Sequence, residues 1–380
     1  MYDDDEHITI SKRPSIMFIN EDDNRKVVEK DNEVNLSKKN SKKNETVKAL
    51  YNVEFRKKDN YLLQQLKVLK DLEKKKTKND LEKGVFFELE PNKETREYME
   101  DFINVEQNNP LESQLFILCD GHTGTTAAEN TAKELPGIFY RNLKDITETE
   151  KESDLKQDIN VIKQGQQEIK LDSSKTDNKE EKILTKVEKA IIRSFSEMDQ
   201  KLKELMKDDL SGCTTNLIYL CWENNKRVIY SGNVGDSRSV LVRQEASLRL
   251  SFDHKASDKS EQIRVKALNG IIIRKRLYGS LAVTRSLGDF EMKSSTECLI
   301  NTPYLTRTEI LDTDKFLVMA SDGIWDSITD SDLFGIVNSI DFNSNDLVTN
   351  NTKNLAKILV AKAMDLGSKD NISCIAIKLN

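Results

Sequence analysis

Cysteine and histidine are scarce in this sequence, which has five cysteines and three histidines among 380 residues. The cysteines lack the paired spacing that a zinc site requires, and four of them lie in or beside apolar, strand-like runs. Scattered thiols of this kind indicate reduced, buried packing residues in an intracellular protein, and they exclude a disulfide framework. The five are Cys119, Cys213, Cys221, Cys298 and Cys374.

Long apolar runs and an excess of positive charge are also missing. No run approaches the ~18–20 residues of a membrane span, and Met1 is followed by acids, not by a basic and then apolar signal sequence. We therefore expect a protein without a membrane span, located in the cytoplasm, the nucleus or both. Of 59 Lys and Arg and 65 Asp and Glu, residues 1–83 hold 20 and 17, which leaves 39 against 48 for the rest. This negative body does not favour nucleic acid as a partner.

The chain changes character near Gly84. Residues 1–83 are rich in Lys, Asn, Asp and Glu with few aromatics, so we predict a low-complexity, mostly disordered extension. Leucines at helical spacing predict one short helix at 61–76, which either packs on the body, frays in solvent or binds a partner. A second polar, charged stretch at 146–181 reads as a loop insertion. No internal repeat is evident.

Residues 84–380 alternate short apolar strands with a few helices. Strand-like stretches include "GVFFELE", "LFILC", "TTNLIYLCW", "RVIYSGNV", "KFLVMASD" and "ISCIAIKL", and "WENNKR" looks like a hairpin loop. Runs of strands interrupted by paired helices predict an α+β layered fold. The helices are predicted at 125–143, 182–206, 259–268 and 353–366.

Acids recur at the ends of these strands, often beside glycine. One isolated carboxylate of this kind is usually a solvated turn residue. Several at converging strand ends would repel one another unless a cation lay among them. Carboxylates without paired Cys or His favour hard ions such as Mg²⁺ or Mn²⁺ over zinc. The acids are Glu100, Asp101, Asp120, Asp236, Asp322 and Asp370.

The stretch "CDGH" adds two further features. Gly121 follows Asp120 directly, and without a side chain its carbonyl could approach an ion held by the acid. His122 would then project beside the ion, in a position to donate a proton. A lone histidine beside a turn is more often structural, but the acids around this one favour a catalytic role.

These motifs together resemble the type 2C, metal-dependent (PPM) serine/threonine protein phosphatases over roughly residues 84–380. The chain carries "REYMED", "CDGHTG", "SGCTTN", "GNVGDSR", "DHK", "GSLAVTRSLGDFEMK", "SDGIWD" and "SKDNIS" in the family's order. Departures are modest: Cys213, Ala256 and a single Gly270 stand where Ser or Thr, Pro and a second Gly are common. None removes an acid.

The resemblance implies a central antiparallel β-sandwich flanked by helices on both faces, with two Mg²⁺ or Mn²⁺ ions per subunit at one end. Water held between the ions would attack phosphorus, and His122 would protonate the leaving alkoxide. Arg96 would clamp the phosphate. By position in the motifs, Asp120 would bridge the two ions. Glu100 and the Gly121 carbonyl would bind one ion, and Asp322 and Asp370 would bind the other. Asp101 would act through bound water, and Asp236 and Asp326 would hold a weaker third ion.

The remaining motifs that match the family pattern are interpreted as structural. We assign no catalytic role to Thr284 or Arg285 in "SLAVTRSLGD", and we read Asp253 and His254 as support. The implied substrates are phosphoserine and phosphothreonine in proteins. We expect a monomer whose extension recruits regulatory partners. The rival reading is a pseudophosphatase, the same fold kept as a binding module, which typically loses metal-binding acids.

Overall fold

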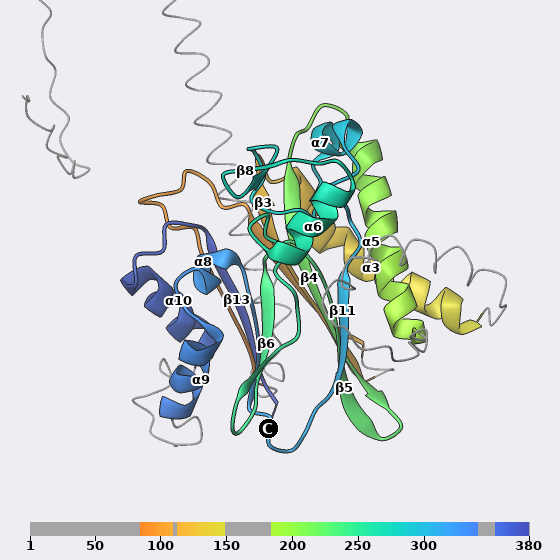
Figure 1. Cartoon of the computed structure of the whole chain (residues 1–380). Helices are drawn as coiled ribbons and strands as arrows, with labels where there is room; N and C mark the ends of the chain where they lie inside the picture. The colour runs from red at the N-terminus through yellow and green to blue at the C-terminus, as the bar shows by residue number, and fades with distance from the viewer. Residues whose placement is uncertain (1–83, 109–111, 149–183, 341–353, 380) are drawn as a thin grey trace, which may run out of the picture. The chain divides into compact units, whose positions relative to one another are not determined.

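The computed structural model describes residues 84–108, 112–148, 184–340 and 354–379. The N-terminal extension, with the helix predicted at 61–76, lies outside these residues, as does most of the 146–181 insertion. Within the described part, two antiparallel sheets pack face to face and helices cover both outer faces (Figure 1). This arrangement confirms the predicted α+β sandwich.

Both sheets are built from antiparallel neighbours throughout. The first sheet has the order β1 (Val85–Glu90), β13 (Ile372–Lys378), β12 (Phe316–Ala320), β6 (Arg238–Val242) and β7 (Ser247–Arg249). The second has the order β11 (Tyr304–Glu309), β5 (Lys226–Val234), β4 (Gly212–Glu223), β3 (Ser113–His122) and β2 (Asp101–Asn108), with β10 (Leu287–Gly288) pairing with β4. A separate hairpin joins β8 (Ile272–Ile273) to β9 (Arg276–Leu277).

The central strands are apolar on both faces because both faces are covered. In β12, Leu317 and Met319 point into the core between the sheets, where they join Phe116 and Leu118 of β3. The alternate residues of β12 face the helices over the first sheet. This double burial explains why the strand reads as a continuous apolar run, "FLVMA", and not as an alternating one.

Two groups of helices cover the sheets. Helices α3 (Thr126–Glu148) and α5 (Lys186–Leu205) pack on the second sheet, and α8 (Asp322–Trp325), α9 (Asp330–Ser339) and α10 (Leu355–Asp365) on the first. Helices α6 (Lys259–Ala267) and α7 (Phe290–Ser295) lie toward one end of the sandwich (Figure 1). Helix α3 runs past the predicted end at residue 143. None of the helices in the described ranges has the length and apolar character needed to cross a bilayer.

The predicted hairpin between β4 and β5 is confirmed. Glu223 pairs with Lys226, and the two turn residues, Asn224 and Asn225, have φ of 51° and 61°. Asparagine tolerates this left-handed conformation, and such two-residue turns match the twist of the flanking strands. The five cysteines are free thiols, and all but Cys221 are buried, as expected.

Helix α5 begins at Lys186, four residues later than predicted, because Thr185 caps it. The Glu188 amide donates to Thr185 Oγ1 at 3.2 Å, and the Thr185 amide donates to Glu188 Oε2 at 2.9 Å. This capping box satisfies two amides that the helix leaves without partners.

We expect Thr185→Ala to lower the free energy of unfolding by about 1 kcal/mol, mainly because the cap is lost. Urea denaturation followed by circular dichroism measures the change, and Thr185→Ser, which keeps the hydroxyl, should recover most of it. An unchanged midpoint for the alanine variant would show that the cap contributes nothing.

Candidate active site

The acids predicted from the motifs come together at one end of the sandwich. Asp101 and Asp120 are direct cross-strand partners on β2 and β3. Glu100 immediately precedes β2, Asp322 is the first residue of α8 after β12, and Asp370 lies two residues before β13. Strand β3 itself continues through Asp120 to His122, three residues beyond the end that the apolar run predicts.

Their electrostatics show that these carboxylates share one site. Burial raises the pKa of Asp120 well above its ordinary value, and the charges of Asp101, Asp322, Asp236 and Asp370 raise it further. Burial and the charges of Asp236, Asp370 and Asp326 have the same effect on the pKa of Asp322. Without a cation, burial and mutual repulsion therefore disfavour the ionisation of these neighbouring carboxyl groups.

Asp101 is the least exposed of these acids. It is 1% exposed, and its Oδ2 has no hydrogen-bond partner among the described residues. Burial raises its pKa to about 7. A buried carboxylate oxygen without a donor calls for a ligand that is absent from the chain itself.

The donor set fits a hard divalent ion, since it consists of buried carboxylates without cysteine or paired histidine. As placed, however, no group of three or more His, Cys, Asp or Glu side chains in the described ranges is arranged so that it could hold a metal ion. The carboxylates thus supply the chemistry that an ion needs, while their side chains would have to turn toward it.

Gly121 is required by the close approach of two strands. A Cβ there would lie 2.6 Å from the carbonyl oxygen of Glu100, and the Gly121 amide donates to that oxygen at 3.1 Å. The Glu100 carboxylate accepts from the Gly124 amide at 2.8 Å. Any side chain at Gly121 would push Glu100 away from Asp120.

Arg96 lies at the edge of the acid cluster. Its Nη2 donates to Asp370 Oδ2 at 2.5 Å, and its side chain is 44% exposed. A planar guanidinium in this position can exchange one carboxylate for the oxygens of an incoming phosphate.

Sequence reasoning missed Asn371, which holds the loop carrying Arg96 and Glu100 in place. The Glu100 amide donates to Asn371 Oδ1 at 2.8 Å, and Asn371 Nδ2 donates to the carbonyls of Pro91 and Tyr98. Asn371 is 3% exposed. Its position directly after Asp370 was the available signal, but the partners are more than 270 residues away in the sequence.

Sequence reasoning also missed Asp289, the partner of His122. His122 Nε2 lies 2.9 Å and 3.0 Å from the two carboxylate oxygens of Asp289, which also accepts from Ser286 Oγ at 2.6 Å. Burial lowers the pKa of His122, but the hydrogen bond and charge of Asp289 outweigh burial and leave that pKa raised. The signal was again an acid directly after a glycine, in "SLGD", within a segment read only as support.

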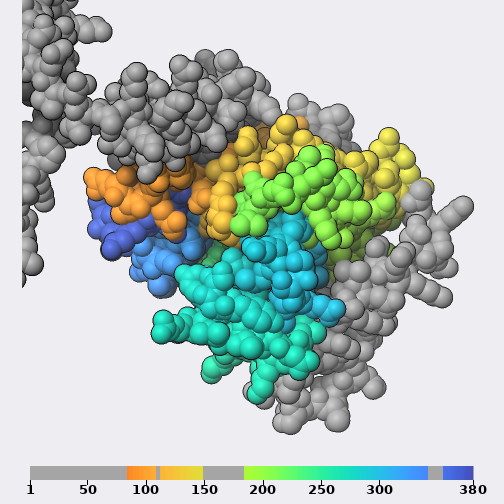
Figure 2. All heavy atoms as spheres, turned by 90° about the horizontal axis from the view of Figure 1, so that it is seen from above, coloured from red at the N-terminus to blue at the C-terminus, as the bar shows by residue number. Residues whose placement is uncertain are grey.

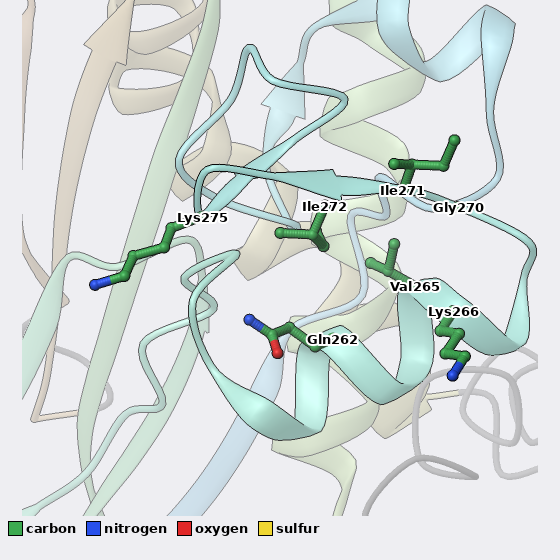
Figure 3. A pocket seen from close by; sticks show the side chains of 7 residues that line it. All are labelled: Gln262, Val265, Lys266, Gly270, Ile271, Ile272 and Lys275. Carbon is green, nitrogen blue, oxygen red and sulfur yellow. The ribbon is translucent and has the colours of Figure 1, made fainter.

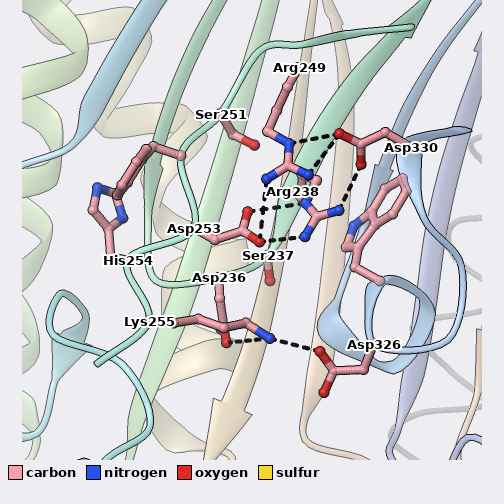
Figure 4. A network of polar contacts seen from close by, with 12 residues as sticks. Asp236, Ser237, Arg238, Arg249, Ser251, Asp253, His254, Lys255, Asp326 and Asp330 are labelled. Atoms are coloured by element: carbon pink, nitrogen blue, oxygen red, sulfur yellow. Dashed lines mark hydrogen bonds and ion pairs between the residues drawn. The ribbon is translucent and has the colours of Figure 1, made fainter. Parts of the chain in front are cut away.

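Asp236 and Asp326 share a lysine. Lys255 Nζ lies 2.7 Å from Asp326 Oδ1 and 3.6 Å from Asp236 Oδ2 (Figure 4). The lysine therefore supplies positive charge at the place where the motifs imply a weaker third ion.

The structural reading of Asp253 and His254 agrees with their contacts. Asp253 pairs with the buried Arg238, which also contacts Asp330 at 2.7 Å (Figure 4). His254 Nδ1 lies 3.1 Å from the Gly235 carbonyl, and burial keeps its pKa well below the ordinary value.

Thr284 and Arg285 both contact the carboxylate of Glu261. Arg285 Nη2 and Arg264 Nη2 each donate to the Glu261 carboxylate at 2.7 Å, and Thr284 Oγ1 donates to it at 2.5 Å. Glu261 is 2% exposed, and burial opposes its ionisation, but the two guanidinium groups lower its pKa. This buried network joins α6 to the "SLAVTRSLGD" segment.

The geometry of this site can be compared with known proteins. The family described as Protein phosphatase 2C matches residues 87–372 of the chain. Protein phosphatase 2C homolog 1 of Saccharomyces cerevisiae is 31% identical over 323 residues, which cover 81% of this chain and 98% of the yeast protein. Protein phosphatase 2C homolog 1 of Schizosaccharomyces pombe is 37% identical over 189 residues, 49% of this chain and 51% of that protein.

Solved structures show the same fold at lower identity. Serine-threonine phosphatase 2C from Toxoplasma gondii aligns with a TM-score of 0.55 and 16% identity over 77% of this chain and 94% of its own. A C. elegans sex determining protein aligns with a TM-score of 0.58 and 20% identity over 78% of this chain and 64% of its own. Because the family match spans well over half of the sequence and the yeast relative is matched over nearly its whole length, this chain belongs to the protein phosphatase 2C family.

Proposed function

We propose that the protein hydrolyses phosphoserine and phosphothreonine in protein substrates at the acid cluster, with the help of two Mg²⁺ or Mn²⁺ ions. The observation that carries the proposal is the meeting of Asp101 and Asp120 across β2 and β3 with the charges of Asp236, Asp322 and Asp370 around them. Such a cluster is costly for the folded chain and has a use only if cations or a phosphate site require it.

The ions would be held as the family motifs imply. Asp120 would bridge them, Glu100 and the Gly121 carbonyl would bind one, and Asp322 and Asp370 would bind the other. When bound, divalent ions of this kind lower the pKa of a shared water and neutralise the charge of the phosphate. The orphaned Oδ2 of Asp101 would accept a hydrogen bond from water in the site. Asp236 and Asp326, which pair with Lys255, would have to leave the lysine to hold a weaker third ion.

The chain's own residues would bind the phosphate and move the proton. Arg96 would leave Asp370 for the phosphate oxygens, which offer a guanidinium two acceptors. His122 would give a proton to the serine or threonine oxygen as it leaves, since an alkoxide is a poor leaving group. Because Asp289 engages Nε2, the proton would come from Nδ1.

Release of phosphate from a phosphothreonine peptide tests the proposal. We expect turnover with Mn²⁺, none with EDTA, and much slower cleavage of the same peptide carrying phosphotyrosine. Equal or faster cleavage of phosphotyrosine would contradict the substrate class. A folded protein that binds Mn²⁺ and releases nothing would instead favour the binding-module reading.

A further inference from the structure

One stretch of the chain has an unusual charge. From Gln262 to Gly288 there are 27 residues with six Lys and Arg and no Asp or Glu. Outside this stretch, residues 84–380 carry 48 acids and 33 bases. A local reversal of this kind creates a positive surface on a negative molecule, and such surfaces steer partners of opposite charge.

Two of the six cations are buried and four remain at the surface. Arg264 and Arg285 neutralise Glu261, as described above. The other four are exposed, and no carboxylate in the described ranges forms an ion pair with them. They are Lys266, Arg274, Lys275 and Arg276.

The turn of the β8–β9 hairpin presents two of these charges at a conformational cost. Arg274 and Lys275 have φ of 51° and 62°, the left-handed region in which Asn and Gly are favoured. Long cationic side chains at both turn positions are therefore unusual, because this type of turn normally has Asn or Gly there. Positions of this kind are commonly kept for a function and not for stability.

Apolar surface lies between the charges. A hollow of about 440 Å³ separates α6 from the hairpin. Figure 3 shows Lys275 at one end of it and Lys266 at the other, with the half-buried Ile272 between them above the fully buried Val265. Ile271, which lines the hollow, is 54% exposed, and Ile273 in β8 is 49% exposed.

The stretch is tied to the active site at both ends. Lys255, shortly before α6, contacts Asp236 and Asp326, and Asp289, the residue after Gly288, contacts His122. In the view from above, the part of the chain near residues 260–280, coloured teal, forms a lobe beside the segments that supply the catalytic acids (Figure 2). A peptide bound at the site would therefore reach this surface with the residues that flank its phosphorylated side chain.

We propose that α6 and the β8–β9 hairpin form a docking site for an acidic segment with an apolar residue, next to the phosphorylated residue of a protein substrate. This inference rests on the proposed function. The cations select acidic side chains by charge, and the hollow between Lys266 and Lys275 receives the apolar one. A nucleic acid fits less well, because the body as a whole is negative and Tyr278 is the one aromatic residue between Gln262 and Gly288.

The test compares two phosphothreonine peptides, identical except that one has glutamates around a leucine beside the phosphothreonine and the other has lysines. The key variant is Arg274→Asn with Lys275→Gly, which removes two charges and supplies the residues that this turn prefers. Lys357→Gln with Lys362→Gln removes two exposed charges from α10 and serves as the control.

We expect wild-type protein to cleave the acidic peptide with a lower KM, and kcat/KM to be about fivefold higher than for the basic peptide at low salt. The turn variant should lose this preference through KM, and turnover of p-nitrophenyl phosphate should not change. The control variant should keep the preference. Equal use of the two peptides by the wild type, or a preference that survives in the turn variant, would overturn the docking site.

Failure of the proposed function gives a different result. If no phosphoester is cleaved, fluorescence anisotropy of the labelled acidic peptide without phosphate still decides the question. Tighter binding to the wild type than to the turn variant would support docking without catalysis. Binding of a single-stranded oligonucleotide that the turn variant loses, with no binding of the acidic peptide, would assign the surface to nucleic acid and refute the proposal.

Discussion

Asp120→Asn is expected to reduce phosphate release by about 1000-fold or more, because the carboxylate that we propose to bridge the two ions loses its charge. The same substitution should stabilise the protein in EDTA. Asp120 is buried among Asp101, Asp322, Asp236 and Asp370, and its pKa is raised well above the ordinary value. An amide of the same shape removes one carboxylate from this cluster and so relieves the repulsion within it.

The stability that Asp120→Asn gains in EDTA should increase as the pH rises. A carboxyl with a raised pKa in the folded state holds its proton where the unfolded chain has lost it, so stability falls as pH rises from the unfolded value of about 4 through the folded one. For Asp101 this window extends to about pH 7. In EDTA the wild type should lose stability between pH 5 and 8. Asp120→Asn should flatten this decline and be more stable than the wild type at pH 8.

Urea denaturation in EDTA and in Mn²⁺ measures both effects. Mn²⁺ should raise the midpoint of the wild type by mass action, and it should raise that of Asp120→Asn much less. Asp365→Asn makes the same chemical change at an exposed position at the end of α10 and should leave activity and midpoint unchanged. Substantial activity in Asp120→Asn, or a lower midpoint in EDTA, would contradict the role of Asp120.

Much of the fold was accessible to sequence reasoning because burial on both faces leaves a clear signal. "LFILC" and "FLVMA" are apolar throughout, and the stripe of α5 keeps helical spacing. Strand β11, "YLTRTE", was missed because it pairs with β5 only, and its side chains are half-buried or exposed and partly polar. Helix α8 has four residues and depends on its place after β12, so its sequence gives no periodicity to detect.

The residues of the candidate site also fall into two classes: those that local sequence patterns reveal and those whose role depends on distant partners. The acids could be named because strand ends beside glycine are local patterns. Asp289 and Asn371 lie in the quoted motifs but received no role, since their roles depend on partners 167 and 271 residues away. Lys255 belongs to the same class, because its charge matters only once folding brings Asp236 and Asp326 beside it.

Glu261 is the position where a single substitution should cost the most stability. Its carboxylate lies between Arg264 and Arg285, and all three side chains are at most 8% exposed. Glu261→Gln keeps the shape but leaves two buried guanidinium groups without their shared counter-charge. We expect the free energy of unfolding to fall by about 3–5 kcal/mol, the usual cost of breaking a buried ion pair by removing one partner.

The pH dependence separates this effect from simple loss of packing. The pKa of Glu261 is lowered in the folded state, so its contribution is complete above the unfolded value of about 4.5 and is lost as pH falls below it. The gap between wild type and Glu261→Gln, measured by urea denaturation, should therefore be constant from pH 8 to 6 and narrow at pH 4 and below. The exposed Glu297→Gln should match the wild type at every pH. A Glu261→Gln variant as stable as the wild type at pH 7 would mean that other contacts of Arg264 and Arg285, such as those to the carbonyls of Cys298 and Thr302, are sufficient to hold α6 and the docking hairpin beside the active site.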